Sequence, residues 1–433
     1  MIRNQLRNRT LALFAVLLFS ALGANAQSSA SYNLAAIHFT GLQRYTAEQG
    51  IAASGLHIGS AITLGDLQSA AQRLSQSGAF DSVSFQYSTR GNDLTAKFGV
   101  TETKDVLPCI FDNFVWFSDA DLDRVLRQHV PLYTGESPVR GDTVEQIRGA
   151  LQDLLRANGI SGDVSELPYG PFGKLIGLLF HVDGASEPIK TTAFSGEVAV
   201  TDKQLLAASA GLTNQEFSVT NVASYASAAL LPLYYERGYL RSQFGRAKVS
   251  PLNANPKGPV TEVSIVLPVV EGNQYSWNGA TWSGNKALAT TELTKILGMN
   301  QQEVANQLKI DTGFANDRKA YLSRGYINVQ IDPQRTLDDA SKLASYSVEI
   351  NEGSQFHMGQ VVFEGLPDGT AADVAKKWKL KPGDVYDAAY PEEFLKNIAP
   401  KELAQKGISY RSTLTKATPD TSALTVNVHI QFR

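Results

Sequence analysis

Two kinds of apolar spacing alternate along this chain, and each recurs at a regular interval. In one kind, apolar side chains recur every three or four residues, as at Leu64, Leu67, Ala71 and Leu74. This spacing is typical of a helix that packs one face on a core. In the other kind, apolar and polar residues alternate, as in residues 263–267, which is typical of a strand with one buried face. The chain is therefore predicted to be an α+β protein of several domains.

Glycines mark the points where helical spacing gives way to strand spacing. Five helical stretches end at a glycine, and an aromatic or apolar residue starts a strand at or just after it. These glycines are Gly78, Gly159, Gly238, Gly325 and Gly407. Because glycine readily adopts the left-handed conformation that ends a helix, we predict caps and turns here rather than ligand contacts.

A second landmark lies upstream, where an aromatic residue, any residue and a glycine end a short strand at 39–41, 194–196, 282–284 and 363–365. The interval between the two landmarks has room for two helices. Thr46 with Gln49, and Thr201 with Gln204, have the spacing of a capping box, which predicts helix starts. Pro232 is predicted to kink or break the helix before Gly238.

Together these landmarks divide the chain into five modules with the order strand, helix, helix, strand, strand. We predict modules over residues 27–104, 105–186, 187–272, 273–353 and 354–433. Each is expected to be a three-stranded sheet covered on one face by two helices. The second module is the least regular, because residues 111–117 lack the glycine after the first strand. Short linkers between modules predict an extended, semi-rigid rod.

Residues 1–26 have the pattern of a secretory signal rather than of a folded segment. Arginines at positions 3, 7 and 9 precede the apolar run 11–22 and the sequence Ala24-Asn25-Ala26. The apolar run is shorter than the roughly 20 residues that a membrane-spanning helix needs. We therefore predict that residues 1–26 are a cleaved signal peptide, and that the mature protein is periplasmic and does not itself span the membrane.

Charge and residue types argue against several classes of function. The formal net charge is −3, which does not favour nucleic acid as a partner. The six histidines are scattered without metal-ligand spacing, and no nucleophile elbow or phosphate loop occurs. The single cysteine, Cys109, has no intramolecular disulfide partner. We predict a protein that is not an enzyme and that has no catalytic residues, metal, cofactor or small-molecule substrate.

The order of landmarks, with a closing Glu-Gly at 271–272 and 352–353, resembles the POTRA (polypeptide-transport-associated) domain of outer-membrane assembly factors. The resemblance covers residues 31 to 433. In that family an array of such modules projects into the periplasm, and a carboxy-terminal β-barrel lies in the outer membrane. No barrel is expected in this sequence, so the resemblance implies a periplasmic relative without a barrel that associates with the outer membrane.

The resemblance also implies where partners bind. It places the open edge of each sheet at the strand after the repeated glycine, here residues 82–87, 241–244, 327–331 and 409–414. An open edge can accept another strand by β-augmentation. The implied partner-binding residues are Val83, Phe85, Tyr87, Ser242, Phe244, Val329, Ile331, Tyr410 and Ser412. The alternative, that an edge is merely solvated or blocked by a neighbouring module, stays open.

Two functions are compatible with this interpretation. The first is a scaffold for outer-membrane protein assembly or translocation, whose partners are unfolded outer-membrane proteins or an outer-membrane β-barrel assembly protein. The second is a structural envelope adapter of the division or secretion type, which joins folded partners without handling clients. The predicted cleavable signal favours the first over the division type.

Overall fold

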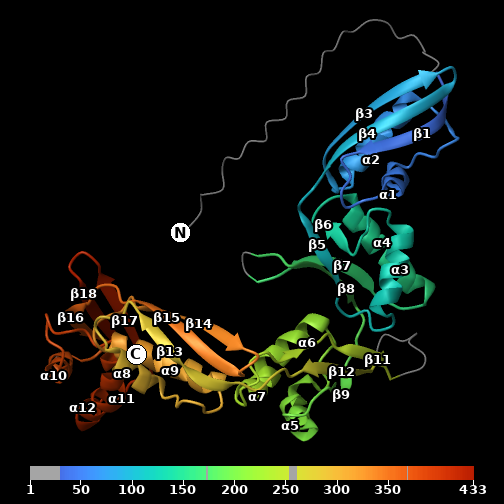
Figure 1. The fold of residues 1–433 in the computed structure, drawn as a ribbon. Helices are drawn as coiled ribbons and strands as arrows, with labels where there is room; N and C mark the ends of the chain where they lie inside the picture. Colours follow the sequence, from blue (N-terminus) through green and yellow to red (C-terminus); the bar gives the residue numbers. More distant parts are fainter. Residues whose placement is uncertain (1–29, 172–173, 253–260, 368) are drawn as a thin grey trace, which may run out of the picture. The chain divides into compact units, whose positions relative to one another are not determined.

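We describe a computed structural model of the chain over residues 30–171, 174–252, 261–367 and 369–433 (Figure 1). The predicted signal peptide, residues 1–26, lies outside the described residues. The described residues contain five separate sheets, each accompanied by helices, which confirms the predicted α+β class. We call each sheet with its helices a module. Contacts group the chain into two compact units: one comprises residues up to Ile110, Asp119–Leu154 and Glu166–Phe180, and the other Phe111–Ser118, Leu155–Ser165 and His181–Arg433.

The first module shows the architecture in its simplest form. Its sheet has the order β2-β1-β4-β3, with β1 parallel to β4 and β3 antiparallel to β4. The strands are β1 Tyr32–Thr40, β2 Ala61–Ile62, β3 Phe80–Arg90 and β4 Asp93–Glu102, and the helices are α1 Ala47–Ser54 and α2 Leu64–Gln76. Leu67 and Leu74 of α2 pack with Leu34 and Phe98 of the sheet in a fully buried core. The amphipathic spacing of α2 therefore supplies the face that covers the sheet.

The second module has a four-stranded sheet in the order β6-β5-β8-β7. Its elements are β5 Val106–Phe111, α3 Asp119–His129, β6 Glu136–Pro138, α4 Asp142–Ala157, β7 Asp163–Tyr169 and β8 Gly177–Asp183. Ile147 and Leu151 of α4 are fully buried, as the helical spacing of apolar residues requires. The first strand of this module, β5, ends at Phe111, and residues 111–117, from this end onward, lack the glycine that follows the first strand in the other modules.

In the third module the second helical stretch is interrupted, as Pro232 predicts. Its elements are β9 Ile189–Ser195, α5 Asp202–Ala208, the 3-10 turn η1 Ala210–Leu212, α6 Val219–Tyr225, the π-helical segment η2 Ala226–Leu230, α7 Leu231–Tyr235, β10 Gln243–Phe244, β11 Lys248–Pro251 and β12 Val263–Val270. Pro232 lies in the first turn of α7, where its missing N–H costs no helical hydrogen bond. The capping box predicted at Thr201 and Gln204 is present.

The fourth and fifth modules have the predicted three-stranded sheets, in the orders β13-β15-β14 and β16-β18-β17, whereas the sheets of the first three modules each contain four strands. The fourth contains β13 Ser276–Ser283, α8 Thr290–Leu297, α9 Gln307–Leu322, β14 Gln330–Asp338 and β15 Leu343–Asn351. The fifth contains β16 His357–Glu364, α10 Thr370–Lys376, α11 Tyr390–Asn397, α12 Ala399–Gln405, β17 Thr413–Asp420 and β18 Thr425–Phe432. In both, the first and last strands are parallel neighbours.

The five repeated glycines end helices, as predicted. All five have a positive φ, between 67° and 81°. In four modules the N–H of the residue after the glycine donates to the carbonyl five residues earlier, as from Tyr326 to Tyr321 at 3.1 Å. This is the hydrogen bond that closes a helix end with a left-handed residue. The repeated glycines therefore have a structural role.

The strand after the glycine starts later than predicted in the third to fifth modules. The sequence predicts these strands over residues 241–244, 327–331 and 409–414. In the structure β10 begins at Gln243, β14 at Gln330 and β17 at Thr413. In the third and fourth modules a turn intervenes, closed by Ser242 N–H to Tyr239 O and by Val329 N–H to Tyr326 O, each at 3.2 Å. The turn lets the aromatic residue after the glycine pack edge-on against a helix tyrosine, with ring centroids 6.0 to 6.5 Å apart. In the first module, by contrast, residues 82–87 lie within β3.

Candidate functional site

In every sheet the strand that follows the repeated glycine lies at an edge. The strands β3, β7, β14 and β17 each pair with the last strand of their module, and β10 with β11 does the same against β12. Among the described residues, no strand pairs with their other side. An edge of this kind presents backbone N–H and C=O groups that can bond another strand.

At the opposite edge of each sheet, the segment between the two helices pairs with the chain at or near the start of the first strand. In the first two modules this segment forms β2 and β6, which pair with β1 and β5. In the other three it forms single antiparallel bridges: Pro188 with Glu216, Ser276 with Val304, and His357 with Val385. The bridge of the fourth module is reinforced by Trp277 N–H to Glu303 O at 2.7 Å and by Gln302 N–H to Trp277 O at 2.8 Å. The first strand of each module is therefore covered near its start, whereas the other edge strand has no strand beside its outer side in the described residues.

A glycine directly after the first strand lets this strand lie against the last one. At Gly284, φ is +79° and an added Cβ would lie 2.1 Å from the carbonyl oxygen of Ile350. Gly41 and Gly365 have the same geometry against Val100 and Phe432. No other residue fits this combination of left-handed backbone and close approach. The aromatic-x-Gly landmark thus marks the contact between the two parallel strands.

The closing glutamate of the motif holds the loop that follows the first strand. The carboxylate of Glu352 accepts hydrogen bonds from the backbone N–H groups of Lys286 and Ala287 at 2.6 and 2.8 Å. Glu271 and Glu102 bind the equivalent backbone N–H groups in the third and first modules. Sequence alone shows the recurring Glu but not this role, because its partners lie near the other end of the module's sequence.

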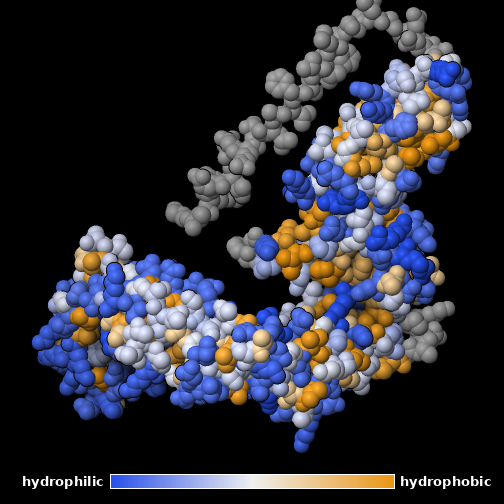
Figure 2. Space-filling model, viewed as in Figure 1, coloured by the Kyte–Doolittle hydropathy of each residue, from blue (hydrophilic) through white to orange (hydrophobic). Residues whose placement is uncertain are grey.

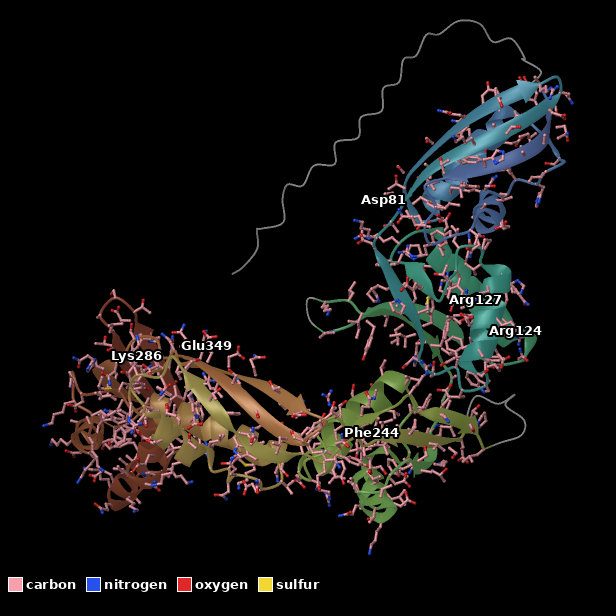
Figure 3. All side chains as sticks on the ribbon, in the orientation of Figure 1. Asp81, Arg124, Arg127, Phe244, Lys286 and Glu349 are labelled. Carbon is pink, nitrogen blue, oxygen red and sulfur yellow. The ribbon has the colours of Figure 1, made fainter. Side chains whose placement is uncertain are left out.

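Five of the predicted partner-binding residues lie on edge strands. Val83 and Phe85 of β3 are half-buried against the core, whereas Tyr87 of the same strand is 47 % exposed. Phe244 of β10 (Figure 3) packs edge-on against Phe194 and Tyr234. Ile331 of β14 is half-buried against the core of the fourth module. These apolar side chains anchor their edge strands to the core and leave the backbone at the edge.

The other four predicted residues precede their strands. Ser242 is buried, and its hydroxyl donates to the carbonyl of Glu271 at 2.7 Å. Val329 is buried in the turn before β14. The ring of Tyr410 packs against Phe432, and the backbone of Ser412 bonds Arg433 before β17 begins. In the third and fourth modules the intervening turn explains why the predicted residues precede the strand. On the edge strands β14 and β17 themselves, Gln334 and Thr415 are exposed positions.

Two surfaces adjoin these edges. In the fifth module a groove lies between α11 and β17 and is lined by Tyr386, Pro391, Leu395, Thr413 and Thr415. In the second module Leu167, Leu175 and Ile176 are 45 to 59 % exposed, and hydrophobic side chains gather over β7 and β8 (Figure 2). Apolar surface thus lies beside the edge strand in both modules.

A buried polar network lies within the second compact unit. Asp112 accepts a hydrogen bond from the Ser218 hydroxyl at 2.8 Å, and its other oxygen lies 3.1 Å from Nδ1 of His181. Burial opposes ionisation of Asp112, but the hydrogen bonds from His181, Thr220 and Ser218 lower its pKa overall. The same bond raises the pKa of His181, while burial raises the pKa of nearby Glu187 to about 7. Asp112 directly follows β5, His181 lies in β8 and Ser218 caps the start of α6, so the network links these three elements.

Two features are absent from the described part of the chain, a metal-binding cluster and a membrane-spanning helix. Within residues 30–171, 174–252, 261–367 and 369–433, no group of His, Cys, Asp and Glu side chains is arranged to hold a metal ion. In the same segments, no helix combines the length and the apolar character needed to cross a bilayer.

Comparison with known proteins agrees with the repeated architecture. Residues 275–353 match the POTRA family model, described as a surface antigen variable number repeat. These residues correspond to the fourth module, from the start of β13 to the Glu-Gly after β15. Residues 275–353 therefore form a POTRA domain.

Two relatives of this chain have a more specific description. A putative outer membrane protein assembly factor of Treponema pallidum is 26 % identical over 222 residues, which are 50 % of this chain and 26 % of the relative. The outer membrane protein assembly factor BamA of Neisseria meningitidis serogroup B is 23 % identical over 236 residues, 51 % of this chain and 28 % of the relative. The chain thus spans about a quarter of the length of these relatives. It is homologous to outer-membrane assembly factors.

Solved structures of POTRA arrays are also similar to this chain. The crystal structure of BamA POTRA domains 3–5 from Haemophilus influenzae covers 58 % of this chain and 99 % of its own length. The sequence identity is 18 % and the TM-score is 0.43.

Proposed function

We propose that this protein is a periplasmic scaffold for outer-membrane protein assembly or translocation, which holds unfolded β-strand segments or partner subunits by β-augmentation. The observation that carries the proposal is the repeated asymmetry of the sheets, in which the strand after the glycine has an open outer side and the opposite edge is partly covered by the module's own chain. The names of the two homologous assembly factors and the predicted signal peptide support the same role and the same location.

The chemistry of such an edge suits a client whose sequence varies. An added strand gains backbone hydrogen bonds, each worth about 0.5–1.5 kcal/mol net, and these bonds do not depend on side-chain identity. A short added strand is therefore held weakly and with little selectivity. Several edges on one chain offset this weakness, because a client bound at one edge is at high effective concentration for the next.

Site-specific photocrosslinking in cells tests the proposal. A photoreactive residue is placed on the open edges at Tyr87, Gln334 and Thr415, and on the closed edges at Val304 and Val385. Val304 and Val385 are matched controls, because they are 42 and 41 % exposed but lie on a segment that already pairs with the first strand. We expect crosslinks to outer-membrane protein precursors at open-edge positions and few at the controls. Equal yields at both kinds of position, or no precursor at any of them, would contradict the proposal.

A second candidate is the structural adapter that joins folded envelope proteins. Proline residues on the open edges of the second to fifth modules favour it, since proline hinders the addition of another strand. The same crosslinks distinguish the two functions: recovery of folded partners alone, without precursors, supports the adapter.

A further inference from the structure

The five open edges differ in their capacity to accept a strand. Each edge strand of the second to fifth modules contains a proline: Pro168 in β7, Pro251 in β11, Pro333 in β14 and Pro419 in β17. Proline has no backbone N–H, and within an edge strand its nitrogen faces away from the sheet. Each of these edges therefore lacks one donor for an incoming strand and presents a bulky ring in its place.

Charged side chains add to this protection. Glu166, Lys248, Arg335 and Lys416 lie within the same four modules' edge strands, and proteins use such residues to keep sheet edges from pairing. The edge of the third module is also split into β10 and β11, of two and four residues. Four modules thus carry devices that are typical of edges kept unpaired.

Away from its ends, the edge strand of the first module carries neither a proline nor a charged residue. β3 is 11 residues long, contains no proline and has no charged residue between Asp81 (Figure 3) and Arg90. It is also the longest of the edge strands. A long, uncharged edge that stayed unpaired would promote aggregation. We therefore expect that a partner strand normally occupies this edge.

The side chains of β3 define the chemistry of that partner. Val83, Phe85 and Tyr87 alternate along one face of the strand, and the first two pack on the core beneath the helices. Ser84 and Gln86 occupy the other face and are exposed. A strand added beside β3 continues both faces, because side chains of neighbouring strands lie side by side. It would place apolar or aromatic residues next to Phe85 and Tyr87, and small polar residues next to Ser84 and Gln86.

We propose that β3 is the principal acceptor edge of this protein, and that it binds an extended segment of alternating apolar and polar residues from an unfolded outer-membrane protein. Membrane-spanning β-strands have this dyad alternation over about ten residues. The inference rests on the proposed function and adds to it the particular edge and the sequence pattern of the bound segment.

A binding experiment with the mature chain tests the choice of edge. The probe is a synthetic peptide of about ten residues that alternates apolar or aromatic residues with serine and threonine, and the control is its scrambled version. Photoreactive residues at Tyr87, Gln334 and Thr415 report labelling at β3, β14 and β17. We expect labelling at β3 on the order of tenfold above the other two edges, since those edges lack a hydrogen-bond donor and carry charges.

Proline substitution then tests whether the backbone of β3 is the binding element. Neighbouring residues of an edge strand direct their N–H groups alternately toward the sheet and away from it. One of Gln86→Pro and Tyr87→Pro therefore removes an outward donor and leaves the β3–β4 ladder intact, as slow amide exchange in β4 would show. This variant should bind the peptide roughly tenfold more weakly. The reciprocal variant Pro333→Thr should increase labelling at Gln334.

The outcomes separate this inference from the proposed function. Stronger labelling at β14 or β17 than at β3 overturns the inference and leaves the proposed function standing. No labelling at any edge, in cells or with the peptide, contradicts both. Crosslinks between the β3 strands of two copies of the chain identify a second copy as the occupant, and also overturn the inference. The labelling yields at β3, β14 and β17 are compared in chains without the proline substitutions. They therefore test the choice of edge even if both proline variants disturb the β3–β4 ladder.

Discussion

Asp317 of α9 is a buried acid whose replacement should stabilise the fourth module. Its side chain is fully buried in the core, and within the described protein neither carboxylate oxygen has a hydrogen-bond partner. The residue lies eight positions before Gly325. The equivalent positions before the other repeated glycines hold Ala70, Leu151, Leu230 and Ala399, which are all fully buried apolar residues. Asp317→Ala therefore restores the residue type that the other modules use.

The size of the effect follows from the pKa of the carboxyl group. Burial raises the pKa of Asp317 from 3.8 to about 7. The folded module thus binds this proton more tightly than the unfolded chain, so the contribution of Asp317 to stability falls as pH rises from about 4 to about 7. About three pKa units correspond to roughly 4 kcal/mol as an upper limit above pH 7. Relaxation around the charge reduces this, and we expect a gain of about 2 to 4 kcal/mol for Asp317→Ala at pH 8.

Amide hydrogen exchange of peptides from α9 and β15, measured in the mature chain at pH 4.5 and pH 8, reports the stability of this module separately from the others. After correction for the intrinsic exchange rate, Asp317→Ala should protect these peptides at pH 8 and have little effect at pH 4.5. Asp317→Asn removes the charge but keeps the shape. It should also protect these peptides at pH 8 and not at pH 4.5, with a smaller gain in protection than Asp317→Ala. If Asp317→Ala lowers protection at pH 8, the carboxylate has a stabilising partner in solution and the reasoning is wrong.

Two further substitutions probe the contacts that hold the first and last strands of the fourth module together. Glu352→Ala removes a charged acceptor of two solvent-exposed backbone N–H groups and should cost about 1 to 2 kcal/mol in urea unfolding, whereas Glu349→Ala on the exposed face of β15 should change little. Gly284→Ala forces a Cβ against the carbonyl of Ile350 at positive φ and should cost about 3 kcal/mol or more, while Gly149→Ala, in α4 with open space around it, should be neutral or stabilising.

Local features of this fold could be predicted from the sequence. The cap at Gly325 and the helix interruption near Pro232 depend on backbone conformations that one or two residues impose. The capping box at Thr201 likewise needs only a partner three residues away. Repetition of these signals from one module to the next then makes the modular architecture visible, because each module has to solve the same packing problem.

Long-range contacts could not be predicted in the same way. Glu352 appears in the sequence only as part of a closing Glu-Gly, although its partners Lys286 and Ala287 lie in the loop that follows the first strand of the module. Asp112 and His181 lie 69 residues apart, and they meet only because β5 and β8 are neighbours in one sheet. Neither contact has a local signal, since the residue types involved are common on protein surfaces.

The exact start of each edge strand could not be predicted from the local sequence. Tyr87 lies on its strand because β3 begins at Phe80, directly after Gly78 and Ala79. Val329 lies in a turn because Tyr326 packs against Tyr321 before β14 starts. An aromatic residue follows the glycine closely in both modules, so the sequence pattern alone does not distinguish a strand start from a turn.

A single strong acceptor edge among weaker ones changes how a long client would be held. If β3 binds first, the remaining client segments reach β14 and β17 from a tethered position, and their weak binding adds to retention only after β3 is occupied. Closing β3 with the proline that preserves its ladder should therefore reduce client capture by the whole chain more than closing any other edge. Equal losses from closing each edge would instead indicate independent sites of similar strength, and the prolines of the other four modules would then have no effect on capture.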